Sequence, residues 1–521
     1  MAGTDTRNFD LQTDIVVAGY GFAGGVAAIE AADAGAGVML LEKMPDPGGI
    51  SICSAGSMRS AHDAGEAFEY LRATNAGRTP DDVLKVLADG MAGIGDYLAK
   101  LAGAVGLTVS SAANRQRSGG NYPLAGWQTF YHTLLDEIPG FDAETAYPHV
   151  AGLAGGRRLF HMLEENIKKR EIDIRLESPV SKLITDAGNH GGSGAAEVIG
   201  VEASIDGKST RIGARKAVIL ATGGFECDED MKSQFWQMMP VLPAMGRQNT
   251  GDGIRMAQQL GARLWHMWHY HGSYGLKDPS GDFPYGIRLK RLPDWVPGDD
   301  SRARAEMVWI LVDRNGRRFM NENPPYTQDT GARNFERFDP VTQSFPRLPA
   351  HMICDEAGRK SYRLADPCYN ERGLDFTWSE DNSAEIEKGI LQRAGTIGEL
   401  AAIIGVDAAD LNETIERWNR FCEAERDQDF GRMPGSFAAI RTPPFYAGEV
   451  WPVVSNTQGG PEHDASQRII DVNGAPIPRL YAAGEMGSAF GHLYLSGSNI
   501  TECFVTGRVA ARHAAEQTGF G

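Results

Sequence analysis

Three glycines near the start of the chain have the spacing that suits the binding of a pyrophosphate. Gly19, Gly21 and Gly24 form the pattern G-x-G-x-x-G, after the apolar run 14–18 and before a run of small residues that is typical of a helix. In such a turn the first glycine bends the chain, the second lets the backbone approach a phosphate, and the third lets the helix pack against the strand. Backbone amides and the positive end of the helix dipole would then face the anion.

An acidic residue supports this interpretation. A second buried strand is predicted at 38–42, and it ends in Glu42, where a carboxylate can accept hydrogen bonds from ribose hydroxyls. Just beyond it, Gly48, Gly49 and Ser51 form a loop whose backbone can follow a diphosphate. The alternative is an ordinary glycine-rich turn, but strand, helix and acid together favour a dinucleotide site.

The surrounding elements indicate an α/β fold with a parallel sheet. Strand, helix and strand over 14–42 make one βαβ unit, and the apolar runs 217–221 and 480–484 also end at glycines. The stretch 195–212 is predicted to form a small antiparallel hairpin around Asp206-Gly207. Because three strands end in glycine turns, we expect them to belong to one sheet and to share one binding edge.

The composition changes in the middle of the chain. Between 278 and 445 proline and aromatic residues are frequent, and strands that end in glycine turns are missing. A chain of 521 residues exceeds the size of about 250 to 300 residues at which a single hydrophobic core stops growing, so two domains are expected. We predict a first domain divided into 1–277 and 446–521, with 278–445 inserted as the second.

Charge and cysteine spacing exclude several classes of protein. A formal net charge of -17 argues against nucleic acid as a partner, because nucleic-acid binders gather Lys and Arg on one face. The six cysteines contain no C-x-x-C pair, so neither an iron–sulfur cluster nor a zinc site is expected. The His-rich tract 265–271 is predicted to alternate on a strand and lacks an acidic companion at metal-site spacing, so no metal is expected.

Two further absences concern the location of the protein. No run reaches the roughly 18 apolar residues that span a bilayer, so no membrane span is predicted. The first thirteen residues lack the basic start and the apolar run of a secretory signal. We therefore expect a cytoplasmic protein; its oligomeric state is left open.

Together these motifs resemble those of the flavoprotein family of fumarate reductase, succinate dehydrogenase and the 3-ketosteroid dehydrogenases. The resemblance extends along the whole chain. It implies a Rossmann-type FAD-binding domain that is split in sequence, with an inserted α+β catalytic cap domain. The further segments that match are 221–225 (ATGGF), 249–262, 311–322 (LVDRNGRRFMNE), 457–460 (TQGG) and 482–508.

The resemblance also implies how FAD is held. Attachment is expected to be non-covalent, because 48–57 has no His at the position that the succinate dehydrogenase type uses. A helix starting near Gly497 would direct its N-terminus at the flavin, although an ordinary capped helix start is the alternative. No second G-x-G-x-x-G follows a strand, so an external electron acceptor or donor is expected. The further FAD contacts implied are Phe22, Ala23, Lys43, Ala221, Thr222, Gly223, Asn249, Asp252, Gly484, Glu485, Gly497, Ser498, Asn499 and Ile500.

The residues that hold two carboxylates in fumarate and succinate enzymes are missing from this chain. Asn456 stands where such enzymes have His before T-x-G-G, and Leu495 stands where they have Arg, so a dicarboxylate is disfavoured. Instead, Tyr494 and Ser496 form a Y-x-S-G segment that resembles the 3-oxo-5α-steroid 4-dehydrogenases. Tyr326 lies close to where those enzymes have another active-site tyrosine.

These hydroxyl groups suit the removal of two hydrogens next to a ketone. The α-hydrogen leaves as a proton while hydroxyl donors stabilise the charge on the ketone oxygen, and the β-hydrogen leaves as a hydride to the flavin. By resemblance, Tyr494 and Ser496 take part in α-proton removal and Tyr326 assists. Which hydroxyl is the base is left open, and a structural role for Tyr494 is the alternative.

The expected substrate is a small-molecule cyclic ketone, either a 3-ketosteroid or a smaller ring such as 4-oxocyclohexanecarboxylate. One alternative is a reductase of an activated C=C bond, similar to fumarate reductase and fed by an external electron donor. Another is a flavoprotein subunit that mainly docks a partner, which predicts a large exposed apolar face or cluster-binding cysteines.

Overall fold

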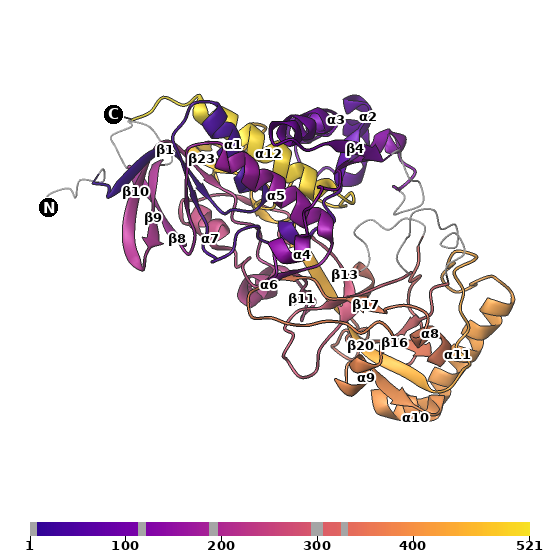
Figure 1. Ribbon diagram of the computed structural model, residues 1–521. Helices are drawn as coiled ribbons and strands as arrows, with labels where there is room; N and C mark the ends of the chain where they lie inside the picture. The colour runs from indigo at the N-terminus through magenta and orange to yellow at the C-terminus, as the bar shows by residue number, and fades with distance from the viewer. Residues whose placement is uncertain (1–7, 113–120, 187–195, 293–305, 325–331, 521) are drawn as a thin grey trace. The chain divides into compact units, whose positions relative to one another are not determined.

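The described part of the chain forms two compact units (Figure 1). Unit 1 comprises Met1–Phe235, Gly246–His271 and Asn456–Gly521, and unit 2 comprises Trp236–Met245 and Gly272–Ser455. The computed structural model describes residues 8–112, 121–186, 196–292, 306–324 and 332–520.

The boundaries of unit 2 differ from the predicted limits of 278 and 445. One boundary falls inside strand β13 (Tyr270–Leu276) and the other inside strand β20 (Phe445–Thr457). The segment 236–245 also belongs to unit 2, although a long stretch of unit 1 follows it. Composition does not reveal these limits, because each of the two strands continues from one unit into the other without a change in residue type.

Unit 1 is built on a sheet that has eight strands within the described residues. Its parallel part has the order β23-β10-β1-β2-β7, β22 pairs antiparallel with β23, and β9 joins β8 to β10. The strands are β1 (Leu11–Ala18), β2 (Val38–Leu41), β7 (Ile172–Arg175), β8 (Val180–Asp186), β9 (Glu197–Ile205), β10 (Lys208–Leu220), β22 (Arg468–Ile470) and β23 (Pro476–Ala482).

The register of the parallel strands places the C-terminal ends of four strands at the same level of the sheet. Ala18 pairs with both Leu41 and Leu220, and Leu220 pairs with Ala482. The residues that follow these four positions include all three predicted glycine turns and Glu42. The prediction of one α/β sheet with a shared edge is therefore confirmed.

Strand β10 is longer than the sequence suggests. The predicted hairpin around Asp206-Gly207 exists, since Lys208 pairs with Ile205 across that turn. Its second strand does not end at 212 but continues unbroken to Leu220. The small and basic residues 213–216 remain extended because β1 pairs with this part of β10 as well.

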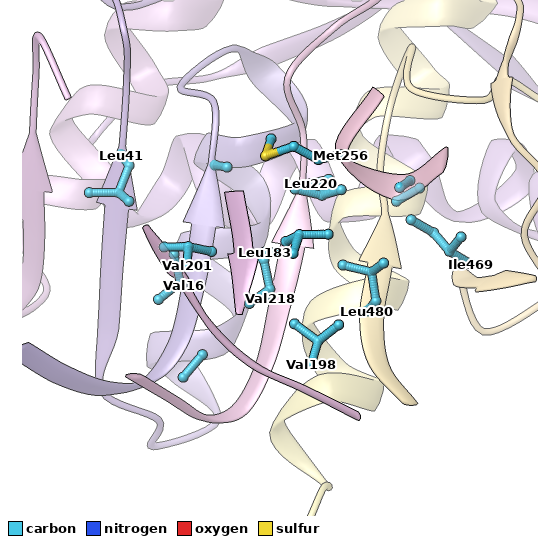
Figure 2. Close-up of a cluster of buried hydrophobic side chains, with 14 of the residues drawn as sticks. Val16, Leu41, Leu183, Val198, Val201, Val218, Leu220, Met256, Ile469 and Leu480 are labelled. Atoms are coloured by element: carbon cyan, nitrogen blue, oxygen red, sulfur yellow. The ribbon is translucent and has the colours of Figure 1, made fainter. Parts of the chain in front are cut away.

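Apolar side chains fill one face of this sheet, as Figure 2 shows. Val16, Val218 and Leu220 point to that face and are completely buried, while Ile15 and Ile219 are equally buried on the opposite face. A parallel sheet buried on both faces is expected in an α/β unit. Each such side chain contributes about 1.5 to 3 kcal/mol by leaving water, so the strand ends are firmly held.

Small residues let helix α1 lie close to its neighbours. It packs against α12 and α5, and α12 also contacts α3 (Figure 1). A Cβ atom at Gly507 of α12 would lie only 2.5 Å from the carbonyl oxygen of Ala23, so this approach requires glycine. The helices of unit 1 are α1 (Phe22–Asp33), α2 (Ala64–Asn75), α3 (Asp81–Ala104), α4 (Ala143–Ala146), α5 (Ala154–Lys168), α6 (Glu229–Phe235), α7 (Asp252–Gln259) and α12 (Ser498–Ala515).

Smaller strands complete unit 1. A three-stranded antiparallel sheet has the order β3-β5-β4, and β12 pairs with β21. No described helix combines the length and the apolar character that crossing a bilayer needs. The strands are β3 (Met58–Ala61), β4 (Val109–Ala112), β5 (Phe130–Leu135), β12 (Leu264–Trp265) and β21 (Gly460–Pro461).

Unit 2 has its own, mainly antiparallel sheet in the order β15-β16-β20-β13-β14-β17, with β11 and β19 also paired to β20. Helices α10 and α11 cover an apolar cluster that includes Trp418. The elements are β11 (Leu242–Pro243), β14 (Ile287–Leu289), β15 (Ile310–Val312), β16 (Ala350–Asp355), β17 (Ala365–Asp366), β19 (Gln392–Ala394), α8 (Glu356–Arg359), α9 (Ala384–Glu387), α10 (Ile397–Ile404) and α11 (Ala408–Glu423).

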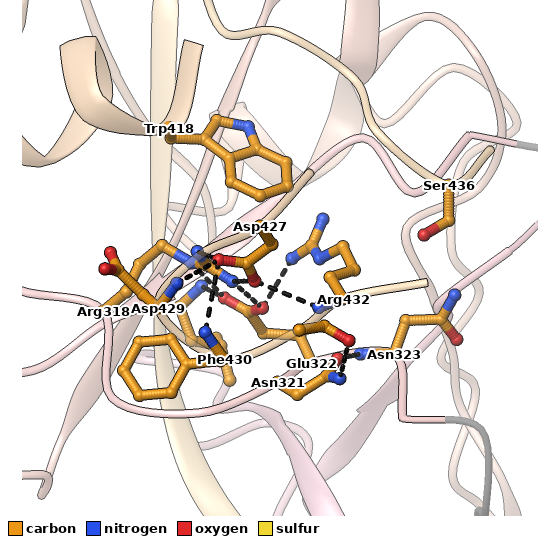
Figure 3. A network of polar contacts seen from close by, with 12 residues as sticks. Arg318, Asn321, Glu322, Asn323, Trp418, Asp427, Asp429, Phe430, Arg432 and Ser436 are labelled. Carbon is orange, nitrogen blue, oxygen red and sulfur yellow. Dashed lines mark hydrogen bonds and ion pairs between the residues drawn. The ribbon is translucent and has the colours of Figure 1, made fainter. Parts of the chain in front are cut away.

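A buried network of ion pairs holds the segment 318–324 within unit 2 (Figure 3). The Glu322 carboxylate accepts hydrogen bonds at 2.7 Å from both Arg318 and Arg432, and Asp427 binds Arg318 at 3.0 Å. The Trp418 ring lies 4.6 Å and 4.4 Å from the two guanidinium groups. Burial alone would raise the pKa of Glu322, but Arg432 and Arg318 lower it to about 2.

Replacing Glu322 should destabilise unit 2 strongly. The change Glu322→Gln removes the carboxylate charge that faces two buried guanidinium groups, and breaking a buried pair costs about 3 to 5 kcal/mol. Urea unfolding followed by tryptophan fluorescence would measure the loss. The matched control is Arg317→Gln, because the Arg317–Asp410 pair is exposed and such pairs contribute about 0 to 1 kcal/mol. Equal unfolding free energies for the two variants would contradict this account.

Candidate functional site

A pocket lies at the shared edge of the main sheet, where the four strands end. Residues that follow β1, β2, β10 and β23 line it together. The predicted FAD contacts among them are Gly19, Gly21, Phe22, Ala23, Glu42, Lys43, Gly49, Ser51, Ala221, Thr222, Gly223, Asn249, Asp252 and Glu485. Lining residues that the sequence did not single out include Tyr20, Ile50, Ser178, Val180, Gln248 and Cys503.

The three glycines of the first turn have separate structural roles. Gly19 has a φ of +102°, and a Cβ there would overlap the carbonyl oxygen of Ala221. A Cβ at Gly24 would overlap the Gly19 carbonyl, so Gly24 serves helix–strand packing and does not line the pocket. A Cβ at Gly21 would lie 3.5 Å from the nearest side-chain atom, Ser51 Oγ. Gly21 therefore leaves a cradle that a ligand can enter.

The Glu42 carboxylate is oriented by two backbone amides. Its Oε2 accepts the N–H of Tyr20 at 2.8 Å and its Oε1 accepts that of Met44 at 2.9 Å. Burial raises the pKa of Glu42 although these amides oppose the shift. Each carboxylate oxygen can accept a further hydrogen bond, so the group suits a ribose hydroxyl.

Lys43 and Asp252 bind each other at the pocket. Lys43 Nζ donates to Asp252 Oδ2 and to Thr250 Oγ1, each at 2.7 Å. The positive charge of Lys43 is thus offset by a neighbouring carboxylate. Helix α1 begins at Phe22 without a side-chain cap, so backbone amides of its first turn are available to a pyrophosphate.

Several buried polar atoms have no hydrogen-bond partner among the described residues. They include both amide atoms of Gln248, which lines the pocket, both amide atoms of Asn499, and the hydroxyl of Ser498. Buried polar groups are nearly always satisfied in native proteins. These atoms, with the glycine cradle and Glu42, form a donor and acceptor set that fits FAD.

The remaining predicted FAD contacts do not line this pocket. Helix α12 begins at Ser498 directly after Gly497, whose φ is +81°, and no side chain caps it. Its first turn therefore leaves backbone amides available to an acceptor. Besides Gly24, the residues outside the pocket lining are Gly48, Gly484, Gly497, Ser498, Asn499 and Ile500.

A pair of buried carboxyl groups beside the pocket is not evident from the sequence. Thr457 N–H donates to Glu485 Oε1 at 2.8 Å and to Glu226 Oε1 at 3.3 Å, so the two carboxyl groups are close. Asn249 donates to the other oxygen of Glu485 at 3.2 Å. Burial raises the pKa of both, and the charge of Glu226 raises that of Glu485 further. Two buried carboxylates with no cation paired to them among the described residues are costly, so burial favours the protonated form of each.

The predicted catalytic residues Tyr494 and Ser496 lie in the turn before α12. The buried Tyr494 accepts the Gly497 N–H on its Oη at 2.7 Å. Its ring lies 4.1 Å from that of His271 and 5.6 Å from that of Phe490, measured between centroids. Tyr326, the third predicted catalytic residue, lies outside the described residues.

Sequence reasoning missed Arg59, which lies on β3 and is 3% exposed. Its Nε donates to the carbonyl oxygen of Ser496 at 2.8 Å. The missing Arg at position 495 suggested a turn without positive charge, yet a guanidinium reaches this turn from elsewhere in the chain. Leu495 itself is buried in an apolar cluster. No motif around Arg59 signals this, because only the folded chain brings β3 to the turn.

The His-rich tract does not form the single strand that was predicted. Strand β12 ends at Trp265, β13 begins at Tyr270, and His266 between them has a φ of +55°. His266 Nδ1 is 2.9 Å from the carbonyl oxygen of Ser488. Within the described ranges, no group of three or more His, Cys, Asp or Glu side chains is arranged to hold a metal ion.

A glycine-lined pocket at the ends of parallel strands, with a buried acidic residue at the end of the second strand, is typical of dinucleotide-dependent proteins. The FAD binding domain family matches residues 14–500, and the chain belongs to this family. It is an FAD-dependent oxidoreductase, as the sequence predicted.

The similarity to known relatives extends along nearly the whole chain. The chain is 30% identical to 4-oxocyclohexanecarboxylate 2-dehydrogenase of Sinomonas cyclohexanicum, over 97% of this chain and 93% of the relative. Its fold is similar to that of 3-ketosteroid Δ1-dehydrogenase from Sterolibacterium denitrificans, with a TM-score of 0.80, 22% identity and coverage of 97% and 99%. A flavocytochrome c3 fumarate reductase gives a TM-score of 0.70 at 23% identity, covering 98% and 79%. These two structures support the fold alone.

Alanine substitutions should separate the roles of two glycines. In Gly21→Ala the new methyl group comes no closer than 3.5 Å to a protein atom but enters the cradle, so FAD affinity should fall at least about tenfold, or about 1.4 kcal/mol. Its urea unfolding midpoint without FAD should stay near that of the wild type. Gly24→Ala should instead lower that midpoint, because its Cβ overlaps a carbonyl group. Fluorescence titration with FAD would measure the affinity, and wild-type affinity in Gly21→Ala would contradict the cradle.

The buried carboxyl pair should make stability depend on pH. Because the pKa of each group is raised in the folded protein, stability is greatest at low pH and is lost as the pH rises above the ordinary value, by about 1.4 kcal/mol per pKa unit. Glu226→Gln should therefore flatten the decline in unfolding free energy as the pH rises above about 4.5, the ordinary value. Glu137→Gln is the control, since that side chain is 95% exposed. An unchanged slope in Glu226→Gln would show that the pKa values of the pair are not raised in the folded protein.

Proposed function

We propose that this protein is an FAD-dependent dehydrogenase that introduces a C=C bond next to a ketone in an alicyclic substrate. The observation that carries the proposal is the environment of Tyr494, a buried phenol that accepts a backbone N–H from Gly497. Accepting this bond makes the phenol more acidic, so it can exchange a proton or donate to an oxyanion. The neutral hydroxyls of Tyr494 and Ser496 match an uncharged ketone.

The residues of the chain divide the reaction between them. Tyr494 and Ser496 remove or relay the α-proton, and Tyr326 assists. Bound FAD supplies the acceptor for the β-hydride. The apolar cluster around Tyr494, which includes Tyr70, Phe130 and Leu495, excludes water from the proton transfer. We further propose that FAD is bound non-covalently and that an external acceptor takes up the electrons.

The substrate that we favour is a small ring of the 4-oxocyclohexanecarboxylate kind. The relative with that activity matches almost the full length of both chains at 30% identity, whereas the 3-ketosteroid enzyme supports only the fold. A 3-ketosteroid is the second candidate.

A reductase of an activated C=C bond is the alternative function. A fumarate reductase of Shewanella frigidimarina, 27% identical over 96% of this chain and 77% of the relative, favours it, and one site can catalyse such a reaction in both directions. Against fumarate itself stands Leu495, which is buried among apolar side chains and cannot pair with a carboxylate. The FAD-binding domain would serve either direction.

Anaerobic mixing tests the proposed function. The yellow holoprotein is mixed with 4-oxocyclohexanecarboxylate or with a saturated 3-ketosteroid, and flavin absorbance is followed. Bleaching by the small ketone is the expected result, and bleaching by the steroid alone would move the assignment to the second candidate. If neither bleaches the flavin but an enone reoxidises the dithionite-reduced protein, the reductase is correct.

Tyr494→Phe should keep the yellow colour and lose at least about 100-fold in the rate of bleaching, since general acid–base groups contribute about 10² to 10⁴. Tyr481→Phe is the control, because Tyr481 is also buried and its hydroxyl bonds His513 at 2.8 Å. The ratio of the two rates at saturating substrate gives the effect. A Tyr494→Phe rate equal to that of Tyr481→Phe would remove Tyr494 from the catalytic site.

A further inference from the structure

One peptide group links a buried guanidinium to the hydroxyl of Tyr494. The carbonyl oxygen of Ser496 accepts the Nε–H of Arg59 at 2.8 Å. The N–H of Gly497, which belongs to the same peptide group, donates to Tyr494 Oη at 2.7 Å. Hydrogen bonds in such a chain polarise one another, and a charged donor at one end strengthens the bond at the other.

The charge of Arg59 has no carboxylate partner among the described residues. Arg59 is 3% exposed, and no acidic side chain in the described part of the chain forms an ion pair with its guanidinium group. Burial lowers the pKa of Arg59 to about 10, and the groups that act in the opposite direction are Tyr494 and Tyr70. A buried guanidinium of this kind stabilises any negative charge that forms nearby.

The backbone of Arg59 is held independently of its side chain. Its N–H donates to the Gly497 carbonyl oxygen at 3.2 Å, and its own carbonyl oxygen accepts the Thr501 hydroxyl at 2.8 Å. A substitution at position 59 keeps both of these bonds. The turn before α12 therefore has support that does not depend on the guanidinium.

Other charged or titratable groups near Tyr494 have identifiable states. Burial and the charge of Arg59 lower the pKa of His132, whose ring lies against Gly497, to about 3, so His132 is neutral. Burial raises the pKa of Glu502 on α12 to about 7, and its carboxylate accepts bonds at 2.7 Å from Ser488 and Ala489. The titratable groups that pack around Tyr494 and its turn are Arg59 of β3, Tyr70 of α2, His132 of β5 and His271 of β13.

We propose that Arg59 is a positioning residue that acts on Tyr494 through the peptide group 496–497 and stabilises its ionised form. The inference deepens the proposed function and rests on it for its role in catalysis. Before the ketone binds, the phenol proton of Tyr494 leaves to solvent; in the closed, water-free complex the phenolate oxygen then takes the α-proton of the ketone. The C–H bond breaks, an O–H bond forms, and the electron pair stays on the α-carbon in conjugation with the ketone.

The ionisation of Tyr494 can be measured without turnover. Holoprotein carrying ¹³C at the Cζ atom of tyrosine is titrated with base, and the signal absent from Tyr494→Phe is assigned to Tyr494. In Arg59→Met the midpoint of this signal should lie at least about one pH unit higher than in the wild type, a tenfold weaker acid. Arg59→Lys retains a charge without the planar donor and should lie between the two.

A matched control shows whether the effect is merely structural. Arg157 is also buried and also donates to backbone carbonyl groups, those of Val150 and Gly152. Arg157→Met should leave the Tyr494 midpoint unchanged. An unchanged midpoint in both Arg59→Met and Arg59→Lys, with FAD bound, would overturn the proposal.

The activity arm separates this inference from the proposed function. With a ketone that the enzyme turns over, the limb of the pH–rate profile that belongs to Tyr494 should move to higher pH in Arg59→Lys. The size of this move should equal the shift in the titration midpoint of the Tyr494 ¹³C signal. If none of the ketones bleaches the flavin of the wild-type protein but the Tyr494 midpoint still moves in the Arg59 variants, the proposed function fails and the link between Arg59 and Tyr494 stands. If the ketone is turned over and the midpoint does not move, the proposed function stands and the link fails.

Discussion

The register of four parallel strands is the constraint on which the rest of unit 1 depends. Ala18, Leu41, Leu220 and Ala482 lie level with one another because each strand is locked to its neighbour by backbone hydrogen bonds. The segments that follow them converge for this reason alone. A shift of one residue would turn every side chain of a strand to the opposite face of the sheet, so the buried core that fixes the register also fixes the pocket.

Buried charge is handled in different ways in the two units. In unit 2, Glu322 is neutralised directly by two arginines, and an aromatic ring covers both of them. In unit 1, Glu226 and Glu485 lie close together with no ion-pair partner among the described residues, and burial raises the pKa of both. Arg59 donates to a peptide carbonyl group and forms no ion pair with a carboxylate among the described residues. These buried groups of unit 1 thus differ from the network of unit 2, in which opposite charges hold the chain directly.

Membership of the FAD binding domain family and the architecture agree with each other. The family match extends over nearly the whole chain because unit 2 interrupts unit 1 in sequence, so both units belong to one inherited arrangement. Within that arrangement, the turn 494–497 combines a buried leucine at 495 with a guanidinium that reaches it from β3. Substrate specificity in such a fold is decided by the residues of the site and not by the fold itself.

The sequence by itself determined the glycine-lined edge of the main sheet. Glycines at fixed spacing after short apolar runs leave few conformations, so Gly19, Gly21 and Glu42 could be assigned from local physics, and the start of α12 after Gly497 could be assigned from its motif. Only the tertiary structure decided which distant residues meet. Glu226 approaches Glu485, and Arg59 reaches the turn before α12, through contacts between segments hundreds of positions apart, for which no local pattern exists. The limits of unit 2 were likewise decided by strand pairing, because β13 and β20 continue from one unit into the other and composition does not record with which sheet a strand pairs.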